Sequence, residues 1–297
     1  MTAVNEIKIS EIIHRSSIPD ADYEINPYVG CVYNCIYCYA RHVQDNSSHN
    51  KPWGSYLDVK INAAELINEQ AGYYSGKDIY IGHVTDPYPP CEKEYGVTRA
   101  ILEKLVPLKP KLSIQTKSDM VLRDIELLKQ FDQCYVGLTI TTLDENIRST
   151  LEDEDAAASV EQRLTALKQL KRDGLGTYVW IGPLLPRVTD WKAIIEKTSI
   201  YTDIYFVELL NIEGAIWNAV KDWLKKHHPH LLSEYEKIYF SSNIFLKPLN
   251  RLFWHFFGRD LTGFNAYRDS LYDEIRAFAS KKKIEVFFND DPVNLLY

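Results

Sequence analysis

The chain has 297 residues, of which 45% are hydrophobic and 25% are charged, and its formal net charge is −7. This composition is typical of a globular protein, and the acidic balance argues against broad, non-specific binding of nucleic acids. No apolar run approaches the roughly eighteen residues of a membrane span, and the first ten residues lack the apolar core of a signal peptide. We therefore expect a cytoplasmic protein without a membrane segment.

Short β-branched or aromatic runs alternate with helical patterns along the first two thirds of the chain. Strands are expected at Asp22–Pro27, Asp78–Val84, Lys111–Thr116, Cys134–Thr141, Thr177–Leu184 and Asp203–Leu210. The helical patterns are Ala63–Tyr74, Val97–Val106, Val121–Gln130, Ser159–Arg172 and Trp191–Tyr201. The alternation predicts a parallel sheet of about six βα units, which fits a partial barrel or an open doubly wound sheet with its site at the carboxyl ends of the strands.

The C-terminal region is expected to be mostly helical from about Ile212. It contains the aromatic-rich piece Leu252–Phe257 and a strand-like run at Ile284–Phe288, and it becomes irregular at Asn289–Pro292. Residues 215–297 carry 12 lysines and arginines against 10 acidic residues, so this region is mildly basic whereas the rest is acidic. A solvated surface is the simpler interpretation, and contact with an anionic substrate is the alternative.

Three of the five cysteines, Cys31, Cys35 and Cys38, lie within eight residues directly after the first expected strand. In a reducing compartment such a group indicates a metal rather than disulfides. Four cysteines would saturate a [4Fe–4S] cluster, whereas three leave one iron open to a small chelating molecule. Zinc is the alternative, because His42 would complete a Cys3His set, although structural zinc sites usually use two separated pairs of ligands.

The spacing Cys-x3-Cys-x2-Cys, with Tyr37 before the last cysteine, resembles the signature of the radical S-adenosylmethionine (SAM) superfamily. The resemblance is greatest to the spore photoproduct lyase-like branch, and it rests on Asn26–Cys31, Cys38–Arg41, Thr85–Tyr88 and Gln115–Ser118. It implies a partial (β/α)6 barrel with a mostly helical C-terminal extension. In domain terms, it implies a core over residues 1–212, with the cluster loop at 26–42, and an extension over 213–297 that packs on the core.

The resemblance also implies an activity. The cysteines would hold a [4Fe–4S] cluster whose open iron chelates SAM, and an electron from an external reductant of the flavodoxin or ferredoxin type would cleave SAM to a 5′-deoxyadenosyl radical. This radical would abstract hydrogen from a substrate that the sequence does not identify and that the resemblance suggests is a nucleic acid. A SAM-dependent methyl- or sulfur-transferring radical enzyme and a non-catalytic metal-binding interaction module are the alternatives.

Polar residues at the ends of the expected strands are candidates for binding SAM. Lys117 ends an apolar run between Thr116 and Ser118, and the resemblance assigns it to the methionine carboxylate of SAM. Thr85 and Asp86 follow the second strand and suit a ribose hydroxyl or the amino group, although a turn before a proline explains them equally well.

Two further strand ends complete the expected cofactor pocket. Thr139 and Thr141 share one face of their strand and could contact ribose and carboxylate, or simply pack. By resemblance, Tyr37 abuts the adenine and Gly182 lets the backbone approach it closely. Glu208 and Asn211 end the sixth strand and could complete the pocket or face the substrate, although a loop with a helix cap is the preferred interpretation of both.

One departure from the spore photoproduct lyase pattern concerns the hydrogen donor. Those lyases carry a donor cysteine where this chain has His83, and histidine is a poor donor of hydrogen atoms, which argues against that repair route. Cys91 is therefore a candidate catalytic donor and Tyr88 a candidate relay, with a loop thiol and a packed ring as the structural alternatives. Cys134 is expected to be a buried, small apolar residue.

Overall fold

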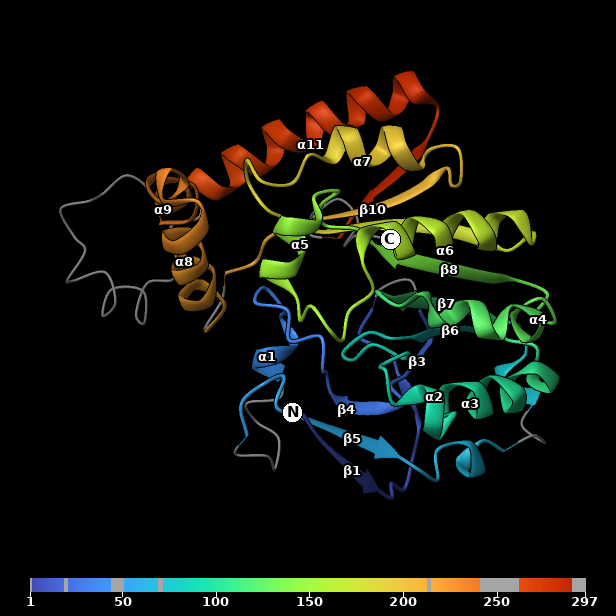
Figure 1. Cartoon of the computed structure of the whole chain (residues 1–297). Coiled ribbons are helices and arrows are strands. Elements are labelled where there is room, and N and C mark those ends of the chain that lie inside the picture. The colour runs from blue at the N-terminus through green and yellow to red at the C-terminus, as the bar shows by residue number, and fades with distance from the viewer. Residues whose placement is uncertain are drawn as a thin grey trace.

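The computed structural model describes residues 2–18, 21–43, 51–68, 72–212, 215–240 and 262–289, without the side chains of His42, Val43 and Ala215. Figure 1 shows a curved sheet with helices packed on its outer face, a small sheet at the N-terminal end and a group of helices from the C-terminal region. The predicted aromatic piece Leu252–Phe257 and most of the irregular Asn289–Pro292 lie outside the described residues.

Seven parallel strands form the main sheet, and they lie side by side in their order along the chain. They are β3 (Tyr23–Ile25), β6 (Asp78–Ile81), β7 (Lys111–Thr116), β8 (Cys134–Thr139), β9 (Gly176–Leu184), β10 (Ile204–Leu209) and β11 (Glu285–Phe288). A short β2 (Ile13–Arg15) pairs antiparallel with β3 at one edge, and β11 is the other edge. This arrangement confirms the partial radical-SAM-type barrel, in which six strands are those of the predicted βα units.

Side chains alternate between the two faces of each strand. On β6 and β7, Ile79, Ile81, Leu112 and Ile114 are buried on the outer face, under the helices, whereas Gln115 lies on the inner face. We call this inner, concave face the lumen. Fully burying one such aliphatic side chain contributes about 1.5–3 kcal/mol.

The outer layer consists of helices that follow the strands in turn. They are α3 (Val97–Leu105), α4 (Ile125–Leu128), α6 (Val160–Arg172) and α7 (Trp191–Thr198), with the 3-10 turns η3 (Val106–Leu108) and η4 (Asp119–Asp124) beside them. The predicted start of α6 is confirmed by a capping box, in which Ser159 Oγ accepts from Gln162 N at 3.2 Å and Gln162 Oε1 accepts from Ser159 N at 2.8 Å.

The predicted helix Ala63–Tyr74 is wrong. The described part of this segment forms only the 3-10 turns η1 (Ala64–Leu66) and η2 (Gly72–Tyr74), because Ile67 is extended and ends the first turn. The helix α5 (Glu145–Leu151) is absent from the predicted elements, although Asp144 caps it by accepting from Asn146 N at 2.8 Å.

A second sheet was also missed by the predicted elements. It contains β1 (Ala3–Ile7), β5 (Tyr56–Lys60) and β4 (Tyr28–Gly30), in that order. Gly30 ends β4 with a φ of +82°, and a Cβ on it would lie 2.5 Å from the carbonyl oxygen of Tyr56, so this position requires glycine. The short helices α1 (Ala40–Val43) and α2 (Glu92–Tyr95) complete the N-terminal half.

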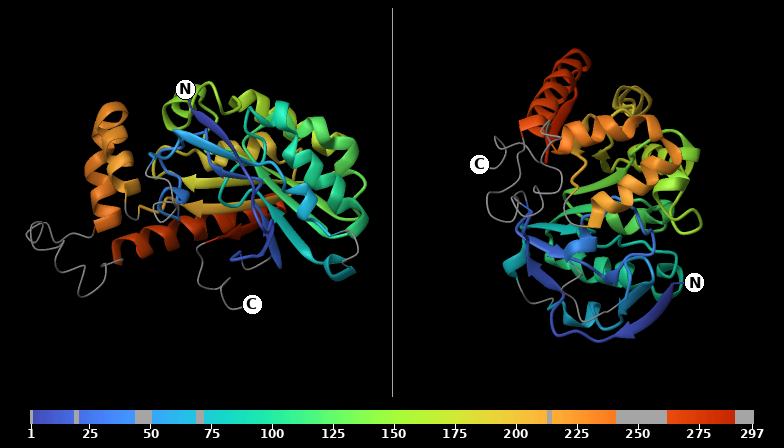
Figure 2. Two further views of the ribbon diagram at one scale, coloured as in Figure 1. Left: turned by 90° about the horizontal axis from the view of Figure 1, so that it is seen from below. Right: turned by 90° about the vertical axis from the view of Figure 1, so that its left-hand side faces the viewer.

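The C-terminal region contributes α8 (Ala215–His227), the turn η5 (Pro229–Leu231), α9 (Leu232–Phe240) and α11 (Thr262–Lys282), as well as β11. Figure 2 shows α8 and α9 at the end of the sheet towards which β9 and β10 point, and Trp223 Nε1 of α8 donates to Thr150 Oγ1 of α5 at 2.9 Å. The helix α11 packs against α7 through Trp191 and Phe278, whose ring centroids are 5.4 Å apart. The region is thus mostly helical, as predicted.

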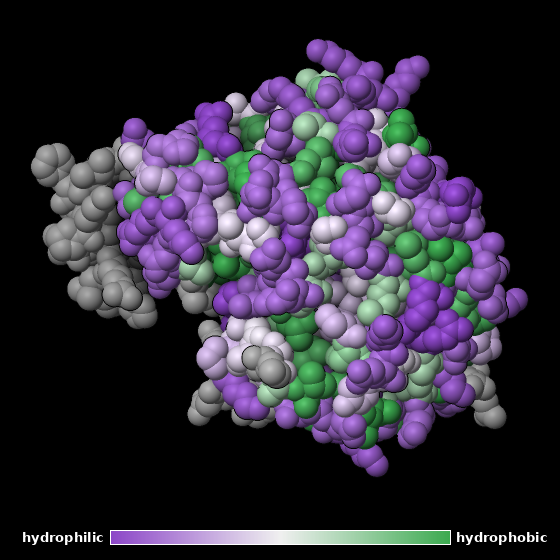
Figure 3. Space-filling model, in the orientation of Figure 1, coloured by the Kyte–Doolittle hydropathy of each residue, from purple (hydrophilic) through white to green (hydrophobic). Residues whose placement is uncertain are grey.

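The visible surface is mainly polar. Figure 3 shows hydrophilic residues over most of the face seen in Figure 1, with hydrophobic residues in small separate groups. Within the described residues, none of the helices combines the length and the apolar character that crossing a membrane requires.

Candidate active site

The three clustered cysteines lie on the loop between β4 and α1. Hydrogen bonds fix this loop from two sides: Thr85 Oγ1, beyond the end of β6, donates to Gly30 O at 2.6 Å, and Ile36 N donates to Leu151 O at the end of α5 at 3.0 Å. Asp153 N also donates to Tyr33 O at 2.8 Å. The loop is therefore held at the carboxyl ends of the strands, where the sequence places the site.

The thiols of this loop are in an environment that favours their neutral form. Burial raises the pKa of Cys31 and of Cys35 to about 12, and that of Cys38 to about 11, and the cysteines add to one another's shifts. Three such thiols remain protonated at neutral pH unless a bound metal supplies positive charge and displaces the protons. Their number and spacing fit a [4Fe–4S] cluster with one open iron.

Among the cations that act on the thiol of Cys35, Lys117 has the largest effect. It follows β7, and its Nζ lies 5.9 Å from the ring centroid of Tyr37. Burial lowers the pKa of Lys117, but the thiolate form of Cys35 and the carboxylate of Glu152 outweigh this effect, and the net pKa lies above its ordinary value. Lys117 is therefore a charged group close to the cysteine loop.

A buried ion pair beneath the loop was not among the predicted site residues. Arg163 of α6 forms a salt bridge with Glu152, and both side chains are almost completely buried. Tyr37 donates its hydroxyl to the same carboxylate, and Arg163 Nη1 donates to Thr139 O at 3.0 Å. Burial raises the pKa of Glu152, but Arg163 and Lys117 outweigh it, so its pKa lies below the ordinary value. The pair connects the loop to the ends of β7 and β8.

The predicted Asp86 brings three strand-end groups together. Its Oδ1 accepts from Thr116 Oγ1 at 2.7 Å and from Tyr88 N at 2.9 Å, and its Oδ2 accepts from Lys117 N at 2.7 Å. Ser118 accepts from the backbone N of Met120 at 3.2 Å and caps η4. Asp86 and Ser118 thus fix the backbone on either side of Lys117.

Thr139, which ends β8, and Thr141 also have protein partners. Thr139 Oγ1 accepts from Gln115 Nε2 at 2.5 Å, and Thr141 Oγ1 lies 3.3 Å from Gly182 O and 3.5 Å from the hydroxyl of Tyr37. Thr141 therefore lies close to both predicted adenine neighbours.

Gly182 is required for a reason that the sequence did not indicate. A Cβ on Gly182 would lie 1.9 Å from Nε1 of Trp180, so the indole ring covers this glycine. Trp180 therefore leans towards the carboxyl end of β9, the end at which the cysteine loop lies.

The two predicted catalytic residues have different surroundings. Cys91 is half-buried at the start of α2, and burial together with Glu92 raises its pKa to about 11. Tyr88 is completely buried, and its backbone oxygen accepts from the hydroxyl of Tyr33 at 2.7 Å. Burial, together with the carboxylates of Asp124 and Glu92, raises the pKa of the Tyr88 hydroxyl. Cys134 is buried on β8, as expected of a small apolar residue.

His83 forms a further polar group at the mouth of the lumen. Its Nδ1 lies 2.9 Å from Glu24 Oε2 of β3, and its backbone oxygen accepts from the hydroxyl of Tyr39 at 2.7 Å. The rings of Tyr39 and His83 are 5.7 Å apart, and Tyr80 lies edge-on to His83 at 6.5 Å. From the sequence, His83 is notable only because it stands where the spore photoproduct lyases carry a donor cysteine.

Among the described side chains, which do not include His42, no group of three His, Cys, Asp or Glu residues is arranged to hold a single metal ion. A cubane cluster spaces its ligands more widely than a single tetrahedral ion does. The zinc alternative requires His42, whose side chain lies outside the described residues, and it stays an alternative.

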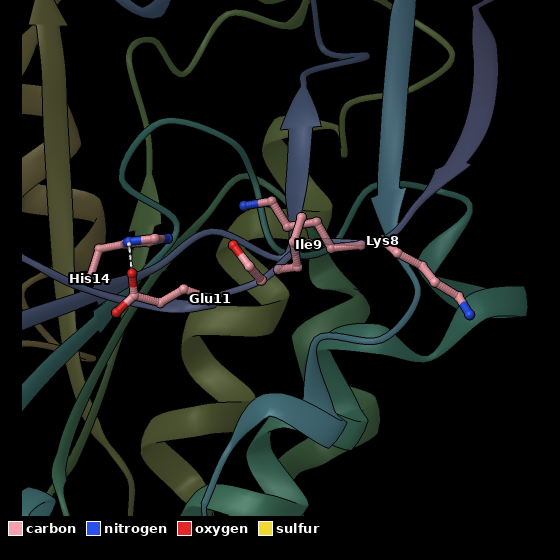
Figure 4. Close-up of a pocket in the computed structure, with 6 residues that line it drawn as sticks. Lys8, Ile9, Glu11 and His14 are labelled. Carbon is pink, nitrogen blue, oxygen red and sulfur yellow. Dashed lines mark ion pairs between the residues drawn. The ribbon is translucent and has the colours of Figure 1, made fainter.

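A pocket of about 620 Å³ lies elsewhere on the N-terminal segment and contains none of the predicted cofactor residues. In Figure 4, His14 and Glu11 face each other, with His14 Nδ1 and Glu11 Oε2 3.6 Å apart, and Lys8 points away from both. Lys8, Glu11 and His14 are exposed, whereas Lys60 of the same pocket is buried and donates from its Nζ to Asn26 O at 2.7 Å. Burial lowers the pKa of Lys60 to about 8.

The comparisons with known proteins agree with this geometry. The family model described as Radical SAM superfamily matches residues 25–196. An uncharacterised protein of Methanocaldococcus jannaschii is 39% identical over 224 residues, which cover 75% of this chain and 83% of that protein. The radical SAM Nalpha-GlyT isomerase of Pseudomonas phage M6 is 26% identical over 64% of this chain and 40% of its own length.

The fold is similar to that of spore photoproduct lyase. One mutant structure of this lyase has a TM-score of 0.54 at 14% identity, with 73% of this chain covered. Another, solved with bound AdoMet and dinucleoside spore photoproduct, has a TM-score of 0.53 at 15% identity, with 76% covered. The matches span 64% and 66% of the lyase chain, slightly less than two thirds.

Proposed function

Because this chain belongs to the radical SAM superfamily, whose enzymes use a [4Fe–4S] cluster and SAM, we propose that it cleaves SAM reductively and abstracts hydrogen from a substrate carbon. The observation that supports this most is the position of the cysteine loop. Hydrogen bonds hold its three cysteines at the carboxyl end of the barrel, where small ligands bind, and the charge of Lys117 acts on Cys35 and Cys38.

In this proposal Cys31, Cys35 and Cys38 hold the cluster and leave one iron open. When bound and reduced, the cluster supplies the electron that cleaves SAM to methionine and a 5′-deoxyadenosyl radical. An external donor of the flavodoxin or ferredoxin type provides that electron. The protein itself contributes binding, orientation and the exclusion of water.

The residues around the loop bind and orient SAM. Lys117 attracts the methionine carboxylate, and Tyr37 packs against the adenine, with the Thr139 and Thr141 face and the backbone of Gly182 beside it. The other predicted residues position this pocket through the hydrogen bonds described above: Thr85 holds the cysteine loop, and Asp86, Thr116 and Ser118 hold the segment around Lys117.

Cys91 is the proposed donor of a hydrogen atom to the product radical. Its raised pKa of about 11 keeps it in the neutral thiol form, which is the form that carries a hydrogen atom to give. The complete burial of Tyr88 favours a structural role for that ring over a relay.

We propose a nucleic acid as the substrate. The support is the similarity of fold to a lyase solved with a dinucleoside photoproduct, together with the mildly basic C-terminal region. The acidic net charge implies that recognition depends on local contacts more than on a broad basic surface.

The test is anaerobic reconstitution with iron and sulfide, followed by dithionite and SAM and quantification of 5′-deoxyadenosine. The wild type and Cys134→Ala, which changes a buried cysteine outside the loop, should both show the iron–sulfur chromophore and form the product. Cys35→Ala should lose both. Lys117→Met should keep the chromophore but weaken SAM binding about ten-fold or more, because it removes the charge that attracts the methionine carboxylate. A ten-fold change in affinity corresponds to about 1.4 kcal/mol.

Two outcomes would contradict the proposal. Formation of methylthioadenosine without 5′-deoxyadenosine would indicate a different cleavage of SAM. Uptake of zinc without a chromophore, with SAM left intact, would indicate a metal-binding module.

A further inference from the structure

The pocket of about 620 Å³ on the N-terminal segment contains a buried cation. Lys60 ends β5, its side chain lines the pocket, and only 9% of the residue is exposed. The volume of the pocket lies within the range of roughly 300–1,000 Å³ that is typical of small-molecule sites. A buried ammonium group in the wall of such a pocket is unusual, because removing a charge from water costs free energy unless a partner compensates for it.

The protein compensates for the charge of Lys60 only in part. Its Nζ donates to Asn26 O at 2.7 Å, which leaves the other donors of the ammonium group without a partner among the described residues. Within the same residues no carboxylate forms an ion pair with Lys60, although Glu24 acts on it from a greater distance. Burial lowers the pKa of Lys60 to about 8, so the surroundings disfavour its charged form. An anion in the pocket would remove this electrostatic cost.

The other polar groups of the pocket suit an anion with several acceptor atoms. Ser10 and His14 line the pocket and can donate from a hydroxyl and from a ring nitrogen. Among the described lining residues Glu11 is the only carboxylate, and because it is exposed and faces His14 at 3.6 Å in Figure 4, its repulsion of an anion is weak. A phosphate group offers three acceptor oxygens and a carboxylate two, so phosphate matches these donors better.

The pocket lies at the edge of the lumen. His14 of β2 is paired in register with Glu24 of β3, and residues directly opposite each other on antiparallel strands project from the same face. Glu24 in turn contacts His83 at the mouth of the lumen, with 2.9 Å between Oε2 and Nδ1. The backbone N of Lys60 donates to Pro27 O at 3.3 Å, in the segment that leads into the cysteine loop. A group bound at Lys60 would thus lie beside the concave face of the sheet.

We propose that this pocket binds a phosphate group, which the ammonium of Lys60 holds together with the donors of Ser10 and His14. The phosphate belongs either to the substrate, as an ester whose remainder extends into the lumen, or to the free ion. The site goes beyond the proposed function, because the binding of phosphate requires neither electron transfer nor the cleavage of SAM.

The test titrates the reconstituted protein with inorganic phosphate, thymidine 5′-monophosphate and thymidine by calorimetry at pH 7.5. Phosphate and the monophosphate should bind and compete for one site, whereas thymidine should not compete with phosphate. Lys60→Met should weaken both anions about ten-fold or more, because it removes a charged donor from the site. Lys129→Met, which changes an exposed lysine that pairs with Glu126 outside the pocket, is the matched control and should bind phosphate as the wild type does.

The pH dependence separates phosphate binding by Lys60 from a purely structural role of this residue. Because the pKa of Lys60 is about 8, its ammonium is charged below that pH and loses its proton above it. Affinity for the monophosphate should decrease about eight-fold from pH 7.5 to 9, since only the charged fraction of the protein binds. Lys60→Arg, whose guanidinium keeps its charge over this range, should show little decrease. The other titratable groups that face Lys60 are Lys8, Glu11, His14 and Glu24, and the arginine variant reports their contribution.

A change at the rim tests the site without altering the buried lysine. Glu11→Gln removes the carboxylate of the pocket and should tighten phosphate binding roughly two-fold, because a repulsive charge is lost. Tighter binding of the monophosphate than of phosphate would assign the site to a phosphate ester, and equal affinities would assign it to the free ion.

The proposal is wrong if the wild type binds neither anion, or if Lys60→Met binds both as the wild type does. It is also wrong if the affinity of the wild type is the same at pH 7.5 and 9. These results are separable from the proposed function, because phosphate binding is measured without turnover and SAM cleavage is measured on the same samples.

Discussion

Two buried carboxylate networks in this molecule use the same chemistry in different places. Glu152 pairs with Arg163 beneath the cysteine loop, and Tyr37 donates its hydroxyl to it. Glu92 is the first residue of α2, and its carboxylate accepts the hydroxyl of Tyr28 and pairs with Arg123. In both networks the carboxylate is buried and the partner is a guanidinium.

The difference lies in what surrounds each network. In the second, Arg123 also pairs with Asp124 at 2.9 Å and Arg99 pairs with Asp124 at 2.7 Å, so two buried carboxylates share two cations. Arg99 pairs in addition with the exposed Glu103 at 3.2 Å. The first has one of each, and its carboxylate also acts on Lys117. A buried ion pair is therefore no sign of function in itself, and its electrostatic neighbours decide its role.

The largest effect is expected for Glu152→Gln. This change leaves the Arg163 charge buried without its partner, which costs about 3–5 kcal/mol of unfolding free energy. It also removes the carboxylate that orients Tyr37, so the reconstituted protein should bind SAM more weakly. Urea unfolding of the cluster-free protein and calorimetry with SAM measure the two effects. Glu154→Gln, which changes an exposed neighbour, is the control and should change neither the unfolding free energy nor the SAM affinity. If Glu152→Gln were as stable as the wild type, the buried pair beneath the loop would not stabilise the fold.

A smaller effect, on stability alone, is expected for Arg123→Met. Two buried carboxylates lose one of their two cations, whereas Arg99 remains, so we expect a loss of about 2 kcal/mol. The chromophore and SAM affinity per folded molecule should stay at the wild-type level. A selective loss of SAM binding in this variant would mean that the second network also serves the cofactor.

The smallest effect concerns pH. The folded-state pKa of Glu152 lies below its ordinary value of 4.5, so its stabilisation is complete above that pH and is lost as the pH falls through the folded value. The difference in unfolding free energy between the wild type and Glu152→Gln should thus be constant from pH 7 to 5 and shrink below about 4.5. Urea unfolding at each pH measures it, and a difference that grows on acidification would show the wrong sign.

The fold could be predicted from the sequence where local patterns decide it. The six strands of the βα units and the start of α6 follow from short apolar runs and a capping box. The small sheet could not be predicted, because β1, β5 and β4 pair over distances in the chain that no local pattern encodes. The segment 63–74 has helical periodicity, but its described part forms 3-10 turns, which shows that tertiary context overrides helix propensity there.

Part of the candidate site could likewise be predicted from the sequence, and part could not. The cysteine spacing and the position of Lys117 at a strand end predict a cofactor pocket from the sequence, and the contacts assigned to SAM stay predictions. Glu152 and Arg163 could not be predicted, because each looks like an ordinary charged helix residue until the fold buries them together. Gly182 was predicted to let the backbone approach the adenine closely, yet a Cβ at this position would lie nearest to the indole of Trp180.

The family match ends at residue 196, whereas β10 begins at Ile204 and β11 at Glu285. Trp180 therefore lies within the matched residues, whereas Phe206 and Phe287, whose rings stack on each other at 5.2 Å, lie beyond them. The family match alone thus does not fix the residues at positions 206 and 287 on the concave face of the sheet.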